Sequence, residues 1–235
     1  MSTAYVEIDP DGDTLIVLPT LESTSARMLY EGSLQERLKS FATAMAAERE
    51  PVAEEVEVGH TPESEAQTHF RVSMKHLVLA SPRAKRMFQG NYTEARPDAD
   101  GLHRWTFEPL FDPAAFEIVM NAIHGYSHKM PRNVSLENMA KIAAIVDDLD
   151  CPQALWFFAK TWINWLKPNR KLDRFHLGHW ILISFVFEEP VIFKEATEQA
   201  IRQTCGSFSS CMLPIRPKIL GMIPAWVLIL SCLTL

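Results

Sequence analysis

Two pairs of side chains in this sequence have the spacing to bind a metal ion. His176 and His179 lie three residues apart on a predicted helix, so both imidazoles would project from one face. Asp147 and Asp148 supply two adjacent carboxylates. A structural metal site usually needs four ligands, and no further ligand stands at a recognisable spacing from either pair. The sequence therefore predicts no metal site.

A hydrolytic enzyme needs an activated nucleophile with a base and oxyanion donors beside it. No Gly-x-Ser-x-Gly turn occurs in the chain, and the segment Cys205-Gly206-Ser207 fits no nucleophile motif. His76 and His124 stand next to apolar residues, where a histidine is more often half-buried with one hydrogen bond satisfied than a ligand. We therefore expect no catalytic residue, no cofactor and no enzymatic activity.

Six residues are candidates for contact with another protein. Four basic side chains cluster on two short predicted helices, where they form either a solvated face or a site for an acidic partner: Lys75, Arg83, Lys85 and Arg86. Trp105 is a further candidate on a predicted strand. Trp156 lies on a predicted helix that is rich in aromatic rings. On that helix Phe158, Trp162 and Trp165 follow helical spacing on one side, which favours core packing for them and leaves Trp156 as the interface candidate.

Three strands and a series of helices are predicted to position these residues. The strands are an apolar run at residues 14–18 and two segments of alternating pattern, residues 68–73 and 103–108. Ser81-Pro82, Asp112-Pro113 and Ser135 are N-terminal helix signals. The predicted helices are residues 33–50, 74–80, 81–90, 112–125, 135–150, 151–165, 174–187 and 189–204, and the two helices that meet near Cys151 are expected to pack antiparallel.

The chain is predicted to contain one main domain with an insertion and extensions. Residues 50–67 contain six glutamates, two prolines and no lysine or arginine, a composition typical of a disordered linker. We divide the chain into a first strand (1–18), an insertion with an amphipathic helix and the acidic linker (19–67), a core (68–166), a C-terminal helical extension (167–212) and an apolar tail (213–235).

One stretch of the core resembles a known family. Residues 70–82 (FRVSMKHLVLASP), followed by Met87-Phe88, look like the strand-then-helix opening of the BTB/POZ domain. The phrases FDPAAF at residues 111–116, IHG at 123–125 and the helices from Leu136 to Ile163 resemble the short BTB proteins of filamentous fungi. The three predicted strands interleaved with helices already indicate an α+β fold. The resemblance implies that this fold is BTB/POZ-like, with a small three-stranded sheet and helical hairpins, plus extra C-terminal helices. It also places residues 9–18 in the same sheet as residues 68–73.

The resemblance implies dimerisation or adaptor work. BTB domains pair with themselves or with other proteins, and some recruit cullin-type ubiquitin ligases. The expected function is therefore non-enzymatic protein–protein interaction, with self-association first. A substrate adaptor for a cullin-type ligase is one alternative. No kelch repeat or zinc finger accompanies the domain, which weakens that alternative.

Composition bears on partners and location. The formal net charge of −6 does not suit polyanions, so no nucleic-acid partner is expected. Scattered cysteines and the lack of a secretory signal favour an intracellular protein, cytoplasmic or nuclear. The apolar run from Ile219 to Leu235 has 17 residues and contains Gly221 and Pro224, whereas a spanning helix needs about 20 residues. This shortfall counts against a membrane anchor, so a membrane-tethered scaffold is kept as a second alternative function. The tail could also pack onto the domain, or it could be an aberrant C-terminus with no role of its own.

Overall fold

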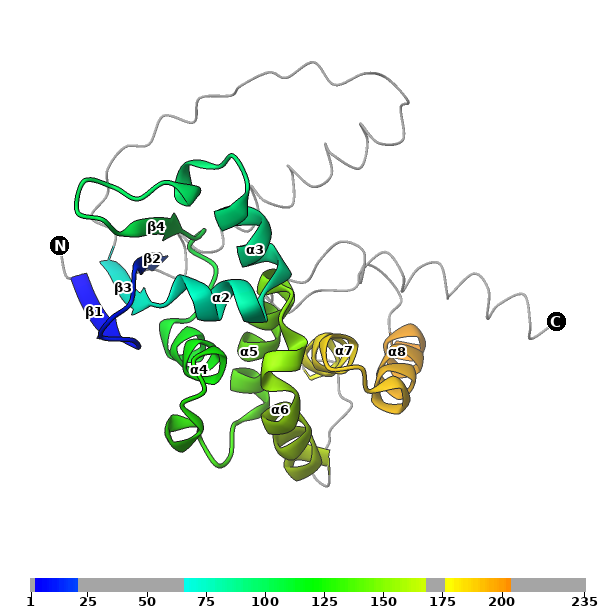
Figure 1. Cartoon of the computed structure of the whole chain (residues 1–235). Coiled ribbons are helices and arrows are strands. Elements are labelled where there is room, and N and C mark those ends of the chain that lie inside the picture. The colour runs from blue at the N-terminus through cyan, green and yellow to red at the C-terminus, as the bar shows by residue number, and fades with distance from the viewer. Residues whose placement is uncertain (1–2, 21–65, 168–175, 204–235) are drawn as a thin grey trace, which may run out of the picture.

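A mixed four-stranded sheet forms one end of the molecule, and helices form the rest (Figure 1). The structure is a computed structural model that describes residues 3–20, 66–167 and 176–203. Its strands are β1 (Thr3–Glu7), β2 (Thr14–Thr20), β3 (Ala66–Val72) and β4 (His103–Thr106), in the order β1-β3-β2-β4. The α+β class predicted from the sequence is confirmed.

The pair β2–β3 holds the sheet together. These strands are antiparallel in continuous register from Thr14 opposite Val72 to Thr20 opposite Ala66. Residues 21–65 separate them in the chain, and each doubling of a loop adds only about 0.6 kcal/mol of closure entropy. The pairing of β2 with β3 confirms the expectation that the first predicted strand joins the sheet of residues 68–73. The predicted helix at residues 33–50, the acidic linker as far as residue 65 and the apolar tail lie outside the described residues. Ala66 and Gln67, which were assigned to the linker, belong to β3, so the strand begins two residues earlier than predicted.

The sheet has a fourth strand that the sequence did not reveal. Strand β1 pairs in parallel with β3, and its side chains are exposed except for the half-buried Val6. Its stability therefore comes mainly from backbone hydrogen bonds to β3, which leave little hydrophobic pattern in the sequence. The prediction of three strands is corrected to four for this reason.

Seven α-helices lie within the described residues, and most begin where the sequence predicted. They are α2 (Met74–Ala80), α3 (Pro82–Gln89), α4 (Pro113–Ile123), α5 (Leu136–Leu149), α6 (Pro152–Leu166), α7 (Leu177–Val186) and α8 (Pro190–Gln203). Short 3-10 turns lie at Thr93–Ala95 (η1) and Ser127–Lys129 (η2). The side chains of Ser81, Asp112 and Ser135 each accept a hydrogen bond from a backbone N–H in the first turn, which confirms these N-caps.

Helix α5 is the centre of the helical layer. It packs between α4 and α7 (Figure 1), and it contacts both of them more extensively than it contacts α6. The expected apolar stripe contains Met139, Ile142 and Val146, which are buried. Ala144 and Ile145 are buried as well, because a helix covers each side of α5. The sequence predicted that α5 would be buried on one side and would pack mainly against α6. In the structure α5 is buried on nearly all sides, and its main neighbours are α4 and α7.

Candidate interaction surface on helix α6

Helix α6 carries an unusual set of exposed aromatic side chains. Trp156 and Trp165 are each 53% exposed and Phe157 is 68% exposed. At about 100° per residue, Trp156 and Trp165 lie at opposite edges of the solvent-facing half of the helix and Phe157 lies between them, and we call these three residues the α6 aromatic face. They are three of seven large hydrophobic side chains that are exposed in the described part of the chain. Concentration on a single helix distinguishes them from scattered surface residues, which need no explanation.

The inward side of α6 explains why these rings face solvent. The buried stripe of the helix consists of Leu155, Ala159, Trp162 and Ile163. Trp162 is 1% exposed, and its indole N–H donates a hydrogen bond to the Pro131 carbonyl at 3.0 Å. The three rings of the α6 aromatic face lie outside this buried stripe and are therefore exposed.

The structure separates the rings that the sequence placed together in the core. Trp162 is buried as predicted, and Phe158 is half-buried with its ring 5.9 Å from that of Trp162. Trp165 is exposed, so its assignment to the core was wrong. The buried stripe is centred closer to Leu155 and Ala159 than the spacing of Phe158 and Trp165 suggested. Trp156 is exposed, and its role as a contact residue stays a prediction.

Two lysines connect α6 to the corner between α7 and α8. Lys160 donates to the Phe187 carbonyl at 3.1 Å and pairs with Glu189 at 2.8 Å. Lys167 pairs with the same carboxylate at 3.1 Å. Burial alone would raise the pKa of Glu189, but the hydrogen bonds from Lys160 and Lys167 outweigh it and hold the pKa below its usual value. The carboxylate therefore stays ionised and fixes α6 against this corner.

The predicted basic cluster contains three exposed residues and one residue that is held by contacts within the fold. Lys75, Lys85 and Arg86 are exposed on α2 and α3, and partner binding by them stays a prediction. Arg83 is half-buried and forms an ion pair with Asp148. Its guanidinium lies 5.4 Å from the ring centre of Trp105. Arg83 therefore belongs to the interior contacts of the fold, which removes it from the candidate surface.

Trp105 was predicted as an interaction residue, and the structure places it in the core. It is 1% exposed on β4, and its ring lies 5.5 Å from that of Phe88 and 4.6 Å from that of Phe107. Alternation along the strand indicated two faces correctly. The helices α3 and α4 cover the face that carries Trp105 and Phe107, as ring contacts with Phe88 and Phe116 demonstrate.

One group of potential metal ligands occurs among the described residues, and the sequence did not indicate it. Asp9, His76 and His124 each bring one ligand atom within 4.8 Å of the others. Both ring nitrogens of His124 already have backbone partners, however. Its Nδ1–H donates to the Met120 carbonyl at 2.8 Å, and its Nε2 accepts from the Ser73 N–H at 3.0 Å. Metal binding by this ring would cost one of these hydrogen bonds.

The predicted structural role of His124 is confirmed, and it has two hydrogen bonds instead of the expected one. The ring ties the end of α4 to the junction between β3 and α2. His76 is exposed, and its ring centre lies 4.9 Å from that of His124. The pair His176 and His179, for which the sequence predicted no metal site, has ring centres 6.4 Å apart and is joined by no third potential ligand in the described residues.

Acidification should weaken the fold through His124. Burial lowers the pKa of His124; His76 lowers it further, whereas the hydrogen bond to Met120 and the charge of Asp9 oppose the shift. The neutral ring accepts the Ser73 N–H, and a protonated ring cannot. Because the folded pKa lies below the unfolded value, this stabilisation is complete above about pH 6.5 and is lost as the pH falls through the folded pKa.

The measurement is the free energy of unfolding in urea at several pH values between 5 and 8, for the chain and for His124→Leu. We expect the variant to lose about 1–3 kcal/mol at neutral pH, because the Ser73 N–H is left without its acceptor. Its stability should also depend less on pH. His76→Ala serves as the control that removes the exposed neighbouring imidazole. Parallel pH profiles for the chain and His124→Leu would contradict the role of His124.

No model of a known protein family matches this chain, and no curated protein resembles it significantly. Among the helices in the described ranges, none has both the length and the apolar character needed to cross a bilayer.

Cys151 is 1% exposed, and burial raises the pKa of its thiol to about 12, so it remains protonated at neutral pH.

Proposed function

We propose that this chain is a non-enzymatic protein–protein interaction module of the BTB/POZ type, and that the α6 aromatic face is a contact surface. The observation that carries the proposal is the exposure of Trp156, Phe157 and Trp165 on one helix. Tryptophan is enriched among residues that dominate binding energies, because a large rigid ring buries much area at little entropic cost. Leaving three such rings in water is unfavourable unless a partner covers them.

The BTB/POZ assignment is supported by where the family-like residues lie. Residues 70–82 run through the end of β3, all of α2 and the start of α3. Phe70 and Leu77 are fully buried in this unit. Ser81 joins it to α5 through a hydrogen bond of 2.5 Å to the Leu149 carbonyl. The residues that carry the resemblance therefore form the junction between the sheet and the helices.

The proposed partner is a second copy of the chain. A two-fold dimer uses the same patch on both subunits, so the patch must be complementary to itself. Aromatic faces meet this condition because rings pack on rings in offset or edge-to-face geometry. The cullin-ligase alternative and the membrane-tethered alternative stay predictions; the tail on which the latter depends lies outside the described residues.

Removing the α6 aromatic face should weaken self-association. The variant Trp156→Ala/Phe157→Ala/Trp165→Ala is compared with the unaltered chain by sedimentation equilibrium over a wide range of concentrations. We expect the dimer dissociation constant to rise at least about tenfold, which corresponds to about 1.4 kcal/mol. The free energy of unfolding of the monomer should change little, because all three side chains are exposed.

The matched control removes three exposed apolar side chains from other elements. Tyr5, Leu79 and Tyr92 are 54%, 86% and 56% exposed on β1, on α2 and beside η1. Their triple replacement by alanine should leave the dissociation constant unchanged. A chain that stays monomeric at every concentration would contradict self-association. Equal weakening in both triple variants would contradict the assignment to α6.

A further inference from the structure

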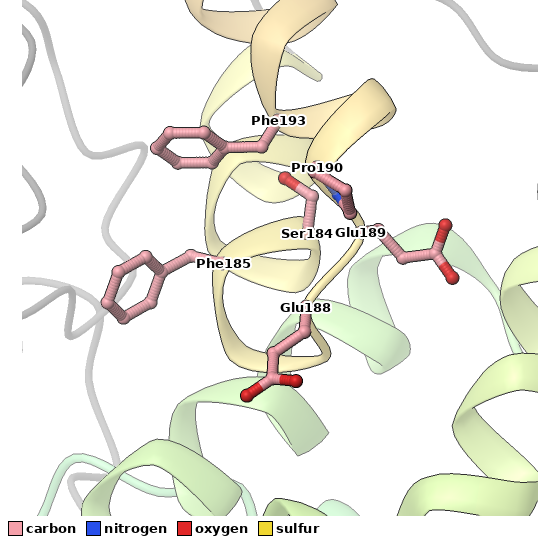
Figure 2. Close-up of a pocket in the computed structure, with 6 residues that line it drawn as sticks. All are labelled: Ser184, Phe185, Glu188, Glu189, Pro190 and Phe193. Atoms are coloured by element: carbon pink, nitrogen blue, oxygen red, sulfur yellow. The ribbon is translucent and has the colours of Figure 1, made fainter.

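A shallow pocket of about 420 Å³ lies at the corner where α7 turns into α8. Two phenyl rings and two carboxylates line most of it (Figure 2). The lining residues are Ser184, Phe185, Glu188, Glu189, Pro190 and Phe193. This pocket is separate from the α6 aromatic face, although Lys160 and Lys167 of α6 pair with one of its residues, Glu189.

The corner is a helix ending that would normally use glycine. The Glu189 N–H donates to the Ser184 carbonyl at 2.8 Å, which closes a Schellman motif. Glu188 occupies the left-handed position of this motif, with φ of 53°. A non-glycine residue there is strained, so the chain bears a conformational cost to hold a glutamate at this point. Such a cost is typical of residues that are kept for a function.

The two carboxylates have different roles. Glu189 is paired with Lys160 and Lys167, and in Figure 2 its side chain points away from the phenyl rings. Glu188 is exposed, and no ion pair or hydrogen bond of its carboxylate occurs within the described residues. Phe185 and Phe193 project to one side of the corner, with ring centres 6.2 Å apart. An unneutralised negative charge thus stands at the edge of a pocket with aromatic walls.

We propose that this pocket receives the side chain of an arginine from a bound protein. A guanidinium can stack on a phenyl ring while its N–H groups pair with a carboxylate, and it sheds water more easily than an ammonium. Phe185 and Phe193 supply the rings, and Glu188 supplies the charge. The inference rests on the proposed protein-binding function and adds a chemical preference for the partner.

The test uses the full chain and a small probe. Amide signals of residues 184–189 and 191–193 are followed by NMR while Nα-acetyl-arginine methylamide is added. The matched probe is the citrulline analogue, which has nearly the same shape and no charge. We expect saturable shifts at these residues with arginine and binding about fivefold weaker with citrulline, since the ion pair and the cation–π contact are lost. Equal binding of the two probes would overturn the proposal.

Variants at Glu188 separate charge from backbone conformation. Glu188→Gln should weaken arginine binding part of the way towards the citrulline level, because the ion pair is lost and the cation–π contact with the phenyl rings remains. Glu188→Gly should reduce the preference for arginine to the same extent, yet raise Tm by about 1–3 °C because glycine relieves the left-handed strain. Asp150→Gly is the control, since Asp150 has φ of 57° at the end of α5, away from the pocket. It should raise Tm without changing arginine binding.

The outcomes keep this inference distinct from the proposed function. Unchanged arginine binding in Glu188→Gln would overturn the pocket, whatever the result of sedimentation. Loss of self-association in the α6 triple variant with intact arginine binding would support the two surfaces as independent. A monomeric chain that nevertheless binds arginine as described would contradict self-association and still support the pocket.

Discussion

Replacing Trp105 by alanine should lower the free energy of unfolding by about 3–5 kcal/mol, the largest loss expected from any change considered for this protein. The side chain is 1% exposed and contacts the rings of Phe88 and Phe107. Its removal leaves a cavity between β4 and α3, and the guanidinium of Arg83 loses one of the rings over which it lies. Urea denaturation followed by circular dichroism measures the effect.

Trp156→Ala is the matched control for this experiment. It removes the same side chain from a position that is 53% exposed, so it should cost less than about 1 kcal/mol. Both tryptophans were candidates for partner contact from the sequence, and the pair of variants separates their roles. Similar losses of stability in the two variants would contradict the burial of Trp105.

Ser81→Ala should be the second most costly change, at about 2–4 kcal/mol. Ser81 is fully buried, and its hydroxyl makes two hydrogen bonds. It accepts the Ala84 N–H at 2.9 Å as the N-cap of α3, and it donates to the Leu149 carbonyl at 2.5 Å at the end of α5. Losing the cap costs about 1 kcal/mol, and a buried carbonyl without its donor adds about 1–3 kcal/mol. Thermal and urea unfolding measure the sum.

Ser135→Ala provides the comparison for Ser81. Ser135 caps α5 by accepting a hydrogen bond from the Asn138 N–H at 3.2 Å. It is exposed, and within the described residues its side chain makes no hydrogen bond to a second helix or strand. We expect a loss of about 1 kcal/mol, the value of a cap alone. If Ser81→Ala cost no more than Ser135→Ala, the hydrogen bond to Leu149 would have no measurable role in joining α3 to α5.

The α6 aromatic face and the pocket at the α7–α8 corner lie on elements that share contacts. Lys160 belongs to α6 and pairs with Glu189, which lines the pocket. Substitutions at Glu189 would therefore disturb both the position of α6 and the pocket wall, whereas substitutions at Glu188 change the pocket alone. A partner that covers the aromatic rings and inserts an arginine would combine a hydrophobic anchor with a charged specificity contact, a common arrangement at interfaces.

The sequence by itself determined the local features of this protein. Helix starts at Ser81, Asp112 and Ser135 were predicted because a cap is a contact between residues three positions apart. The stop after α4 at Gly125, with φ of 77°, follows from the freedom of glycine in the same way. The α+β class also followed from local periodicity, since strands and helices repeat their side-chain directions at different intervals.

Only the tertiary structure decided which of two similar residues lies inside. Trp105 and Trp165 were each assigned to the wrong environment, because burial depends on elements that are distant in the chain and cover one face. Strand β1 was missed because backbone pairing with β3 leaves no mark on its side chains. The proximity of Asp9, His76 and His124, and the presence of Glu188 in one pocket with Phe185 and Phe193, arise in the same way. Periodicity acts over a few residues, whereas packing unites segments that no short-range pattern connects.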